Sequence, residues 1–191
     1  MYIKANIDDC AIIINDFLPN DLFKAITSLN LKADQDSYNT WHKDLYKDKD
    51  NSITMKSVNH TKPIAYITEG KIETDIQILN DFCKILISCP FIPFKKKSSI
   101  NITQFEYDKF SGINWHNDDG YTINYSFYMH DTWNDNWGGE TLIDTNRGLP
   151  LVSYPYPNTL LTIKNNIQHK VCPVTGPKKR KVLQIRGIFY E

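Results

Sequence analysis

The chain has 191 residues, 41% of them hydrophobic and 13% aromatic, which is a globular composition and excludes a largely disordered protein. Lysine plus arginine equal aspartate plus glutamate at 22 each, so a formal net charge of zero argues against a nucleic-acid binder or a protein of anionic membranes. The four cysteines form no C-x-x-C pair, which suggests reduced thiols. The N-terminus lacks an apolar signal region, and no stretch is long and apolar enough to span a membrane. We therefore expect a cytoplasmic protein.

The N-terminal part begins with a short strand and contains two helices. Residues 10–15 form a β-branched apolar run, which predicts a strand. Apolar side chains at helical spacing predict helices over about residues 21–29 and 74–88, and Pro90 ends the second helix.

The polar segment between the two helices, residues 32–73, is long for a plain connection. Long connections of this kind are commonly functional lids, so we expect a substrate-side lid with short strands at about 54–58 and 64–67. Within a single domain over residues 1–191, we therefore assign 1–97 to support and lid and 98–191 to the core.

The C-terminal part is rich in short apolar runs separated by turn sequences such as Asp119-Gly120 and Trp137-Gly138-Gly139. The runs predict strands over residues 100–107, 122–129, 139–142, 159–163, 167–171 and 179–189. Many short antiparallel strands favour a mainly β fold, a double-stranded β-helix (jelly roll) or barrel packed against the N-terminal helices.

Two histidines and one aspartate form a candidate metal site. His116-Asn117-Asp118 lies at a strand edge, and His169 follows about fifty residues later. Two imidazoles and one carboxylate are the ligands of a facial-triad Fe(II) site, which leaves the opposite coordination positions open. A single histidine is more often a structural residue than a ligand, and we expect the other three on the surface or in the lid: His42, His60 and His130.

Several motifs in the same order strengthen this interpretation. They are Phe105-Glu106-Tyr107, Trp115-His116-Asn117-Asp118, Trp137-Gly138-Gly139-Glu140 and His169-Lys170-Val171-Cys172-Pro173-Val174. Together they resemble the 2-oxoglutarate/Fe(II) oxygenases, and within them the prolyl-4-hydroxylase-like branch. The resemblance covers about residues 100–190. It implies Fe(II) held by His116, Asp118 and His169, with 2-oxoglutarate and O₂ as co-substrates, ascorbate as a further candidate cofactor, and no catalytic residue beyond the metal ligands.

The resemblance also implies a cation for the C5 carboxylate of 2-oxoglutarate, about nine or ten residues after the second histidine. This chain offers the run Lys178-Lys179-Arg180-Lys181. Strand alternation puts Arg180 and Arg186 on one face and Lys179 on the other. We favour Arg180 because the guanidinium fork matches a carboxylate, with Lys179 as its main rival and Arg186 behind.

Aromatic residues and glycines lie near these motifs. Tyr128 could donate its hydroxyl to the same carboxylate or could be a core aromatic, and Tyr107 has a similar claim. Trp115 and Trp137 are expected to be packing residues. Gly138 and Gly139 are expected in a tight turn where strands approach closely.

The resemblance implies hydroxylation of a C–H bond with release of succinate and CO₂. The prolyl-4-hydroxylase-like motifs point to a prolyl residue in a peptide or protein as substrate. A free amino acid or other small molecule remains an alternative, because one such site serves many substrates. A non-catalytic jelly roll or a cupin-like metal-binding module is the alternative from a different class, and we expect no nucleic-acid or membrane partner.

Overall fold

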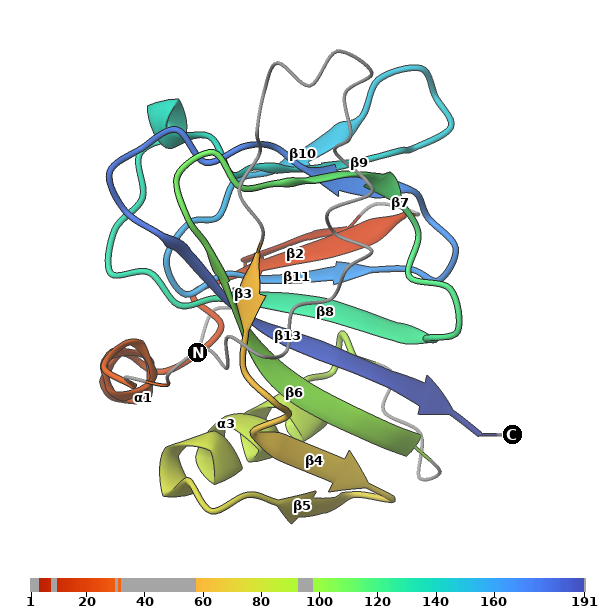
Figure 1. Cartoon of the computed structure of the whole chain (residues 1–191). Coiled ribbons are helices and arrows are strands. Elements are labelled where there is room, and N and C mark those ends of the chain that lie inside the picture. The colour runs from red at the N-terminus through yellow and green to blue at the C-terminus, as the bar shows by residue number, and fades with distance from the viewer. Residues whose placement is uncertain (1–3, 8–9, 30, 32–57, 93–97, 191) are drawn as a thin grey trace.

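Two long antiparallel strands, β6 (Ser98–Tyr107) and β13 (Arg180–Phe189), pair along their whole length in the middle of the larger of two sheets. Figure 1 shows this computed structural model with its elements coloured along the chain. The residues that the structure describes are 4–7, 10–29, 31, 58–92 and 98–190.

The larger sheet has nine antiparallel strands among the described residues. Their order is β1 (Lys4–Ile7), β2 (Ala11–Asn15), β11 (Leu160–Ile163), β8 (Ile123–Tyr128), β13, β6, β4 (Ala65–Thr68) and β5 (Lys71–Glu73), and β3 (Asn59–His60) also pairs with β6. Neighbouring strands such as β2 and β11 come from opposite ends of the chain, so the sheet ties the two halves of the sequence together.

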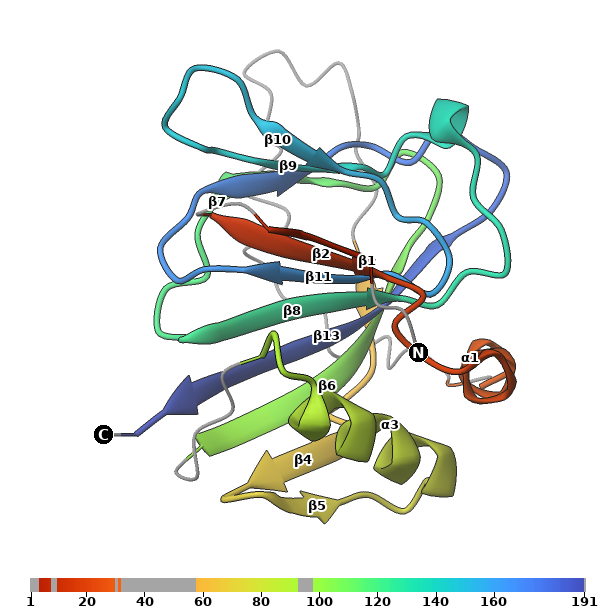
Figure 2. The same cartoon turned by 180° about the vertical axis from the view of Figure 1, so that it is seen from behind.

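The smaller sheet packs against one end of the larger one, as Figures 1 and 2 show. Its order is β10 (Leu151–Ser153), β9 (Thr141–Ile143), β12 (His169–Val171) and β7 (Ile113–His116). The apolar cluster of this part of the fold includes Phe105, Ile113, Tyr128, Ile143, Leu161 and Val182. The two sheets therefore form the walls of a double-stranded β-helix.

Helix α3 (Gln77–Ser88) covers the outer face of the larger sheet, and α1 (Asn20–Thr27) contacts α3 and lies near the ends of the strands (Figure 2). Phe82 of α3 packs on Phe127 of β8 with ring centres 5.2 Å apart. Leu183 and Ile185 of β13 belong to the same core. Each such fully buried side chain stabilises the fold by about 1.5–3 kcal/mol.

The structure confirms the predicted fold class and most of the predicted strands. Strands β1, β3, β5, β7 and β10 were not among the predicted ranges. The strand predicted at 64–67 corresponds to β4, and β4 and β5 form a hairpin of the larger sheet. Residues 32–57, with most of the strand predicted at 54–58, lie outside the described residues. The five unpredicted strands are too short for their alternating patterns to reveal them.

Neither described helix has the length and hydrophobicity that crossing a bilayer requires.

Candidate metal and 2-oxoglutarate site

Strand pairing brings the three predicted metal ligands together. His116 ends β7, His169 begins β12, and the two are directly opposed in the register of the smaller sheet. Asp118 lies two residues beyond β7. One ligand atom from each residue falls within 4.8 Å of the others, and the two imidazole centres are 4.3 Å apart. Within the described part of the chain, this is the one cluster of such side chains that could hold a metal ion.

Backbone carbonyl groups fix the tautomers of both histidines. Nδ1 of His116 lies 2.7 Å from the carbonyl oxygen of Asn114, and Nδ1 of His169 lies 3.0 Å from that of Ile167. A carbonyl oxygen only accepts hydrogen bonds, so each Nδ1 must carry the proton and donate it. Each Nε2 therefore presents a lone pair, which is what a metal ion requires of histidine.

The charge state of the cluster also suits a divalent cation. Burial and the neighbouring His169 lower the pKa of His116, so its imidazole is neutral at pH 7. Burial alone would raise the pKa of Asp118, but the neighbouring His169 and the charge of Arg186 outweigh it and lower the pKa to about 2. The set thus offers a charged carboxylate together with imidazole nitrogens, the protonation states that metal binding demands.

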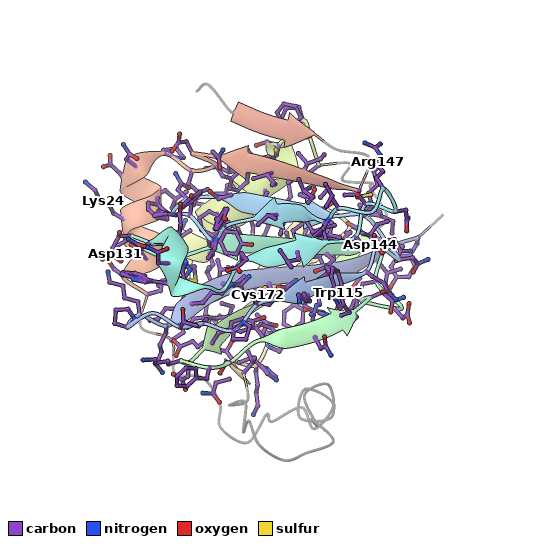
Figure 3. All side chains as sticks on the ribbon, turned by 90° about the horizontal axis from the view of Figure 1, so that it is seen from above. Lys24, Trp115, Asp131, Asp144, Arg147 and Cys172 are labelled. Atoms are coloured by element: carbon purple, nitrogen blue, oxygen red, sulfur yellow. The ribbon has the colours of Figure 1, made fainter. Side chains whose placement is uncertain are left out.

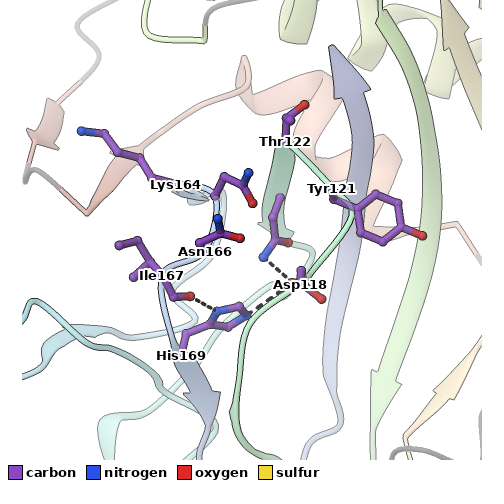
Figure 4. A pocket seen from close by; sticks show the side chains of 9 residues that line it. Asp118, Tyr121, Thr122, Lys164, Asn166, Ile167 and His169 are labelled. Atoms are coloured by element: carbon purple, nitrogen blue, oxygen red, sulfur yellow. Dashed lines mark hydrogen bonds and ion pairs between the residues drawn. The ribbon is translucent and has the colours of Figure 1, made fainter. Parts of the chain in front are cut away.

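Both carboxylate oxygens of Asp118 have partners, as Figure 4 shows in part. Oδ2 accepts a hydrogen bond from the Asn124 amide and lies 3.5 Å from Nε2 of His169. Oδ1 lies 3.1 Å from Nη2 of Arg186. The side chains of Asp118 and His169 are only 8% and 7% exposed, at the floor of a small pocket that Tyr121 and Asn124 help to line.

Arg180, the favoured anchor for 2-oxoglutarate, begins β13 and is only 2% exposed. Its Nη2 donates to Oγ1 of Thr141 at 3.2 Å, and its Nε has no hydrogen-bond partner among the described residues. No acidic side chain of the described ranges forms an ion pair with it. A buried guanidinium without an acidic partner is costly, and an anion bound beside it would offset that cost.

Two tyrosines flank this guanidinium. The Arg180 guanidinium carbon lies 4.5 Å from the Tyr107 ring centre and 5.1 Å from that of Tyr128. The Tyr128 hydroxyl lies 3.3 Å from Oγ1 of Thr141. Burial raises the pKa of Tyr107, against the opposing charge of Arg180, so its phenol stays protonated. Both predicted tyrosines thus lie beside the predicted cation.

The two alternative cations, Lys179 and Arg186, do not lie beside Arg180. Lys179 is half exposed and pairs with Asp108 at 3.1 Å and Glu106 at 3.4 Å on the outside of the sheet. Arg186 faces inward as strand alternation predicts, but it lies beside Asp118, six residues along the strand from Arg180.

The sequence did not single out three polar residues of this inner wall. They are Thr141, Asn124 and Gln184. The Gln184 amide donates to Oδ1 of Asn124, and Ser126 donates to Gln184 Oε1 at 3.0 Å. Cross-strand pairing of β8 with β13 produces this chain of amides, which ends on Asp118. The alternation of β13 could have indicated Gln184, because it shares a face with Arg180.

The glycine pair has a clear role at this site. Gly138 has φ +68°, and a Cβ there would lie 2.2 Å from the carbonyl oxygen of Pro173. At Gly139 a Cβ would lie 3.1 Å from Cδ of Arg180. The predicted close approach is therefore confirmed, and at the second glycine it makes room for Arg180 itself.

Trp115 lies outside the site. It is 39% exposed on the outward face of the smaller sheet, with the Lys170 amine 5.5 Å from its ring centre (Figure 3). His130, expected on the surface or in the lid, is instead 5% exposed, with its ring centre 4.4 Å from that of Trp133. That expectation is wrong because His130 lies two residues after β8 and its ring packs against Trp133. His42 lies outside the described residues.

Comparison with known proteins agrees with this geometry. Residues 103–185 match the family model of the 2OG-Fe(II) oxygenase superfamily. This range contains His116, Asp118, His169 and Arg180. No curated protein matches the sequence itself.

Several solved structures are similar in fold at low sequence identity. A Pseudomonas putida prolyl-4-hydroxylase has a TM-score of 0.60 and 14% identity over 95% of this chain and 93% of that one. The viral collagen prolyl hydroxylase of Paramecium Bursaria Chlorella virus-1 has a TM-score of 0.59 and 11% identity over 94% and 96%. A Trichoplax adhaerens prolyl hydroxylase, solved with a hypoxia inducible factor peptide fragment, has a TM-score of 0.58 and 16% identity over 95% and 84%. Residues 103–185 are therefore similar to the 2OG-Fe(II) oxygenase superfamily, and the chain has a fold like that of the prolyl hydroxylases.

Proposed function

We propose that this protein is an Fe(II)- and 2-oxoglutarate-dependent dioxygenase that hydroxylates a C–H bond of a prolyl residue in a peptide or protein. The match of residues 103–185 to the superfamily model implies Fe(II), 2-oxoglutarate and O₂. The observation that carries the proposal is the buried guanidinium of Arg180, which has no acidic partner among the described residues and shares an inner wall with the amide chain that reaches Asp118.

In this proposal each group has a defined task. His116, His169 and Asp118 hold Fe(II), and their arrangement on one side leaves positions for co-substrates. Arg180 binds the C5 carboxylate of 2-oxoglutarate through its guanidinium fork, with the Tyr128 and Thr141 hydroxyls beside it. When bound, the iron and 2-oxoglutarate supply the oxidising chemistry that splits O₂, releases succinate and CO₂, and hydroxylates the substrate.

The residues of the chain itself orient the metal ligands and exclude water from the site. Carbonyl oxygens hold the two imidazoles in one tautomer and one orientation. The apolar cluster around Val182, Leu161 and Ile143 packs between the sheets and keeps the inner wall dry. This chemistry needs no protein nucleophile or general base.

The prolyl substrate is supported by the fold shared with the prolyl hydroxylases, one of which was solved with a peptide bound. A non-catalytic jelly roll is disfavoured, because the three metal-ligand side chains converge and their histidine tautomers are suited to a metal ion.

The first experiment is an anaerobic titration of the Fe(II)-loaded protein with 2-oxoglutarate, following the visible charge-transfer band of the chelated complex. We expect a band in the wild type, no band in His116→Ala, and a band that needs far more 2-oxoglutarate in Arg180→Ala. Lys179→Ala is the matched control and should behave as wild type.

Peptides that contain proline are then incubated with the complete system, with and without ascorbate, and examined for a mass gain of one oxygen. A wild-type protein that binds the metal but shows no band would refute the dioxygenase proposal. A band without prolyl product would refute the prolyl substrate alone.

A further inference from the structure

Two of the three arginines in the chain point from β13 into the space between the sheets. Arg180 lies between Tyr107 and Tyr128, away from the metal ligands. Arg186 lies beside Asp118, with its guanidinium carbon 5.5 Å from the Phe105 ring centre and 5.8 Å from that of Tyr121. The proposed function uses only the first of these cations.

Arg186 keeps hydrogen-bonding capacity for a ligand. Its contact with Asp118 uses Nη2, whereas a guanidinium has five N–H donors. Its Nε is buried without a hydrogen-bond partner among the residues described. The side chain is 17% exposed, so a molecule at the pocket can reach it. The other oxygen of Asp118 is bonded to Asn124, so the carboxylate does not depend on Arg186 alone.

The formal charges around the metal do not balance once both cofactors are in place. Fe(II) contributes two positive charges and each arginine contributes one. Asp118 contributes one negative charge and 2-oxoglutarate two, and imidazoles bound to a metal contribute none, so one positive charge remains. Lys179 and Lys181 are paired with Glu106 outside the sheet, and the Lys164 side chain extends away from Asp118 in Figure 4. The surplus therefore lies at Arg186.

We infer that the substrate carries a carboxylate close to the carbon that is oxidised, and that Arg186 binds it. This inference rests on the proposed function and narrows its substrate class. A surplus charge in a shielded site is costly, and a carboxylate neutralises it with the geometry that a guanidinium prefers. The carboxylate comes either from a free amino acid or from an acidic residue beside the target in a peptide.

The test uses matched acid and amide probes with the Fe(II)- and 2-oxoglutarate-loaded protein. One arm compares the twenty free amino acids with their carboxamides. The other compares blocked peptides in which proline is followed by glutamate with the same peptides carrying glutamine. Product is measured as a mass gain of one oxygen, and succinate formation gives kcat/KM.

We expect the wild type to prefer the acid member of the productive pair by about 100-fold. Arg186→Gln should reduce that preference to about threefold or less, mainly through KM, and Arg186→Lys should restore part of it. The acid-to-amide ratio is insensitive to how much of the variant is active. The charge-transfer titration should show that Arg186→Gln still binds 2-oxoglutarate, unlike Arg180→Ala. Arg147→Gln, at the exposed third arginine in the connection between β9 and β10, is the control (Figure 3).

The arm that yields product identifies the source of the carboxylate. Equal turnover of acids and amides, an unchanged ratio in Arg186→Gln, or no product from any acid probe would each overturn the inference, provided that the wild type shows the charge-transfer band. If the wild type shows no band, the proposed function itself fails, and this outcome is distinct from failure of the inference about Arg186.

Discussion

The guanidinium carbon of Arg180 lies 4.5 Å from the centre of the Tyr107 ring, and both side chains are almost completely buried. An aromatic face holds a desolvated cation with about 1–2 kcal/mol. We therefore expect Tyr107→Leu to weaken 2-oxoglutarate binding about tenfold, because the guanidinium loses its support. Tyr107→Phe keeps the ring and should weaken binding by no more than about threefold. Titration of the charge-transfer band measures both, and equal losses would contradict this role of the ring.

Arg180 should dominate the affinity for 2-oxoglutarate. Arg180→Met removes the buried cation and leaves the incoming carboxylate unpaired, which should weaken binding about 100-fold. Arg180→Lys keeps the charge without the fork and should fall between that variant and wild type. Lys179→Met, on the outer side of the sheet, should change binding less than about twofold, consistent with an exposed ion pair. If Lys179→Met lost more affinity for 2-oxoglutarate than Arg180→Met, the assignment of Arg180 as the anchor would be wrong.

The glycine turn before β9 should be intolerant of a side chain. Gly138 has a positive φ, and a Cβ there would lie 2.2 Å from a backbone oxygen. Gly138→Ala should therefore lower the free energy of unfolding by about 3 kcal/mol or more. Gly148 also has positive φ, but a Cβ there would meet nothing within 4 Å. Gly148→Ala should cost only about 1 kcal/mol. Urea unfolding of both variants separates the steric clash from the backbone strain. Similar losses of unfolding free energy in the two variants would contradict the predicted clash at Gly138.

His130 should make stability depend on pH. Burial, followed by the charge of Arg180, lowers its pKa to about 3, whereas the unfolded chain has an ordinary value near 6.5. Below that ordinary value the unfolded state binds the proton and the folded state does not, so stability falls as the pH falls from about 6.5 towards 3.

The matched variant is His130→Phe, which keeps an aromatic ring beside Trp133. Between pH 6.5 and 5, the wild type should lose about 2 kcal/mol more of its unfolding free energy than this variant. Urea unfolding at the two pH values measures the difference. Parallel losses in the two proteins would show that His130 is not the group responsible.

The metal cluster and the inward arginine could be predicted from motifs and strand periodicity. The His-Asn-Asp motif with a distant histidine indicated the ligands, and alternation along β13 indicated the face on which Arg180 lies. Asn124 and Thr141 could not be predicted, because their roles follow from pairing between strands distant in sequence. The burial of His130 was missed for a similar reason, since it depends on Trp133 folding over it.

The polar N-terminal region shows another limit of sequence patterns. The pattern predicts β4 as a short strand within a lid, but it does not predict β5, whose three residues alternate too briefly. Their place in the sheet follows from pairing with β6, whose long apolar run supplies the partner. Edge strands gain their stability from such a neighbour more than from their own residues.

The two anchors stand on different walls of the fold. His116 and His169 belong to the smaller sheet, whereas Arg180 belongs to the larger one. A metal ion chelated by 2-oxoglutarate would therefore link the two sheets, which neither the metal ion nor 2-oxoglutarate could do alone. The increase in Tm with both bound should exceed the sum of the increases with each alone, because each would strengthen binding of the other.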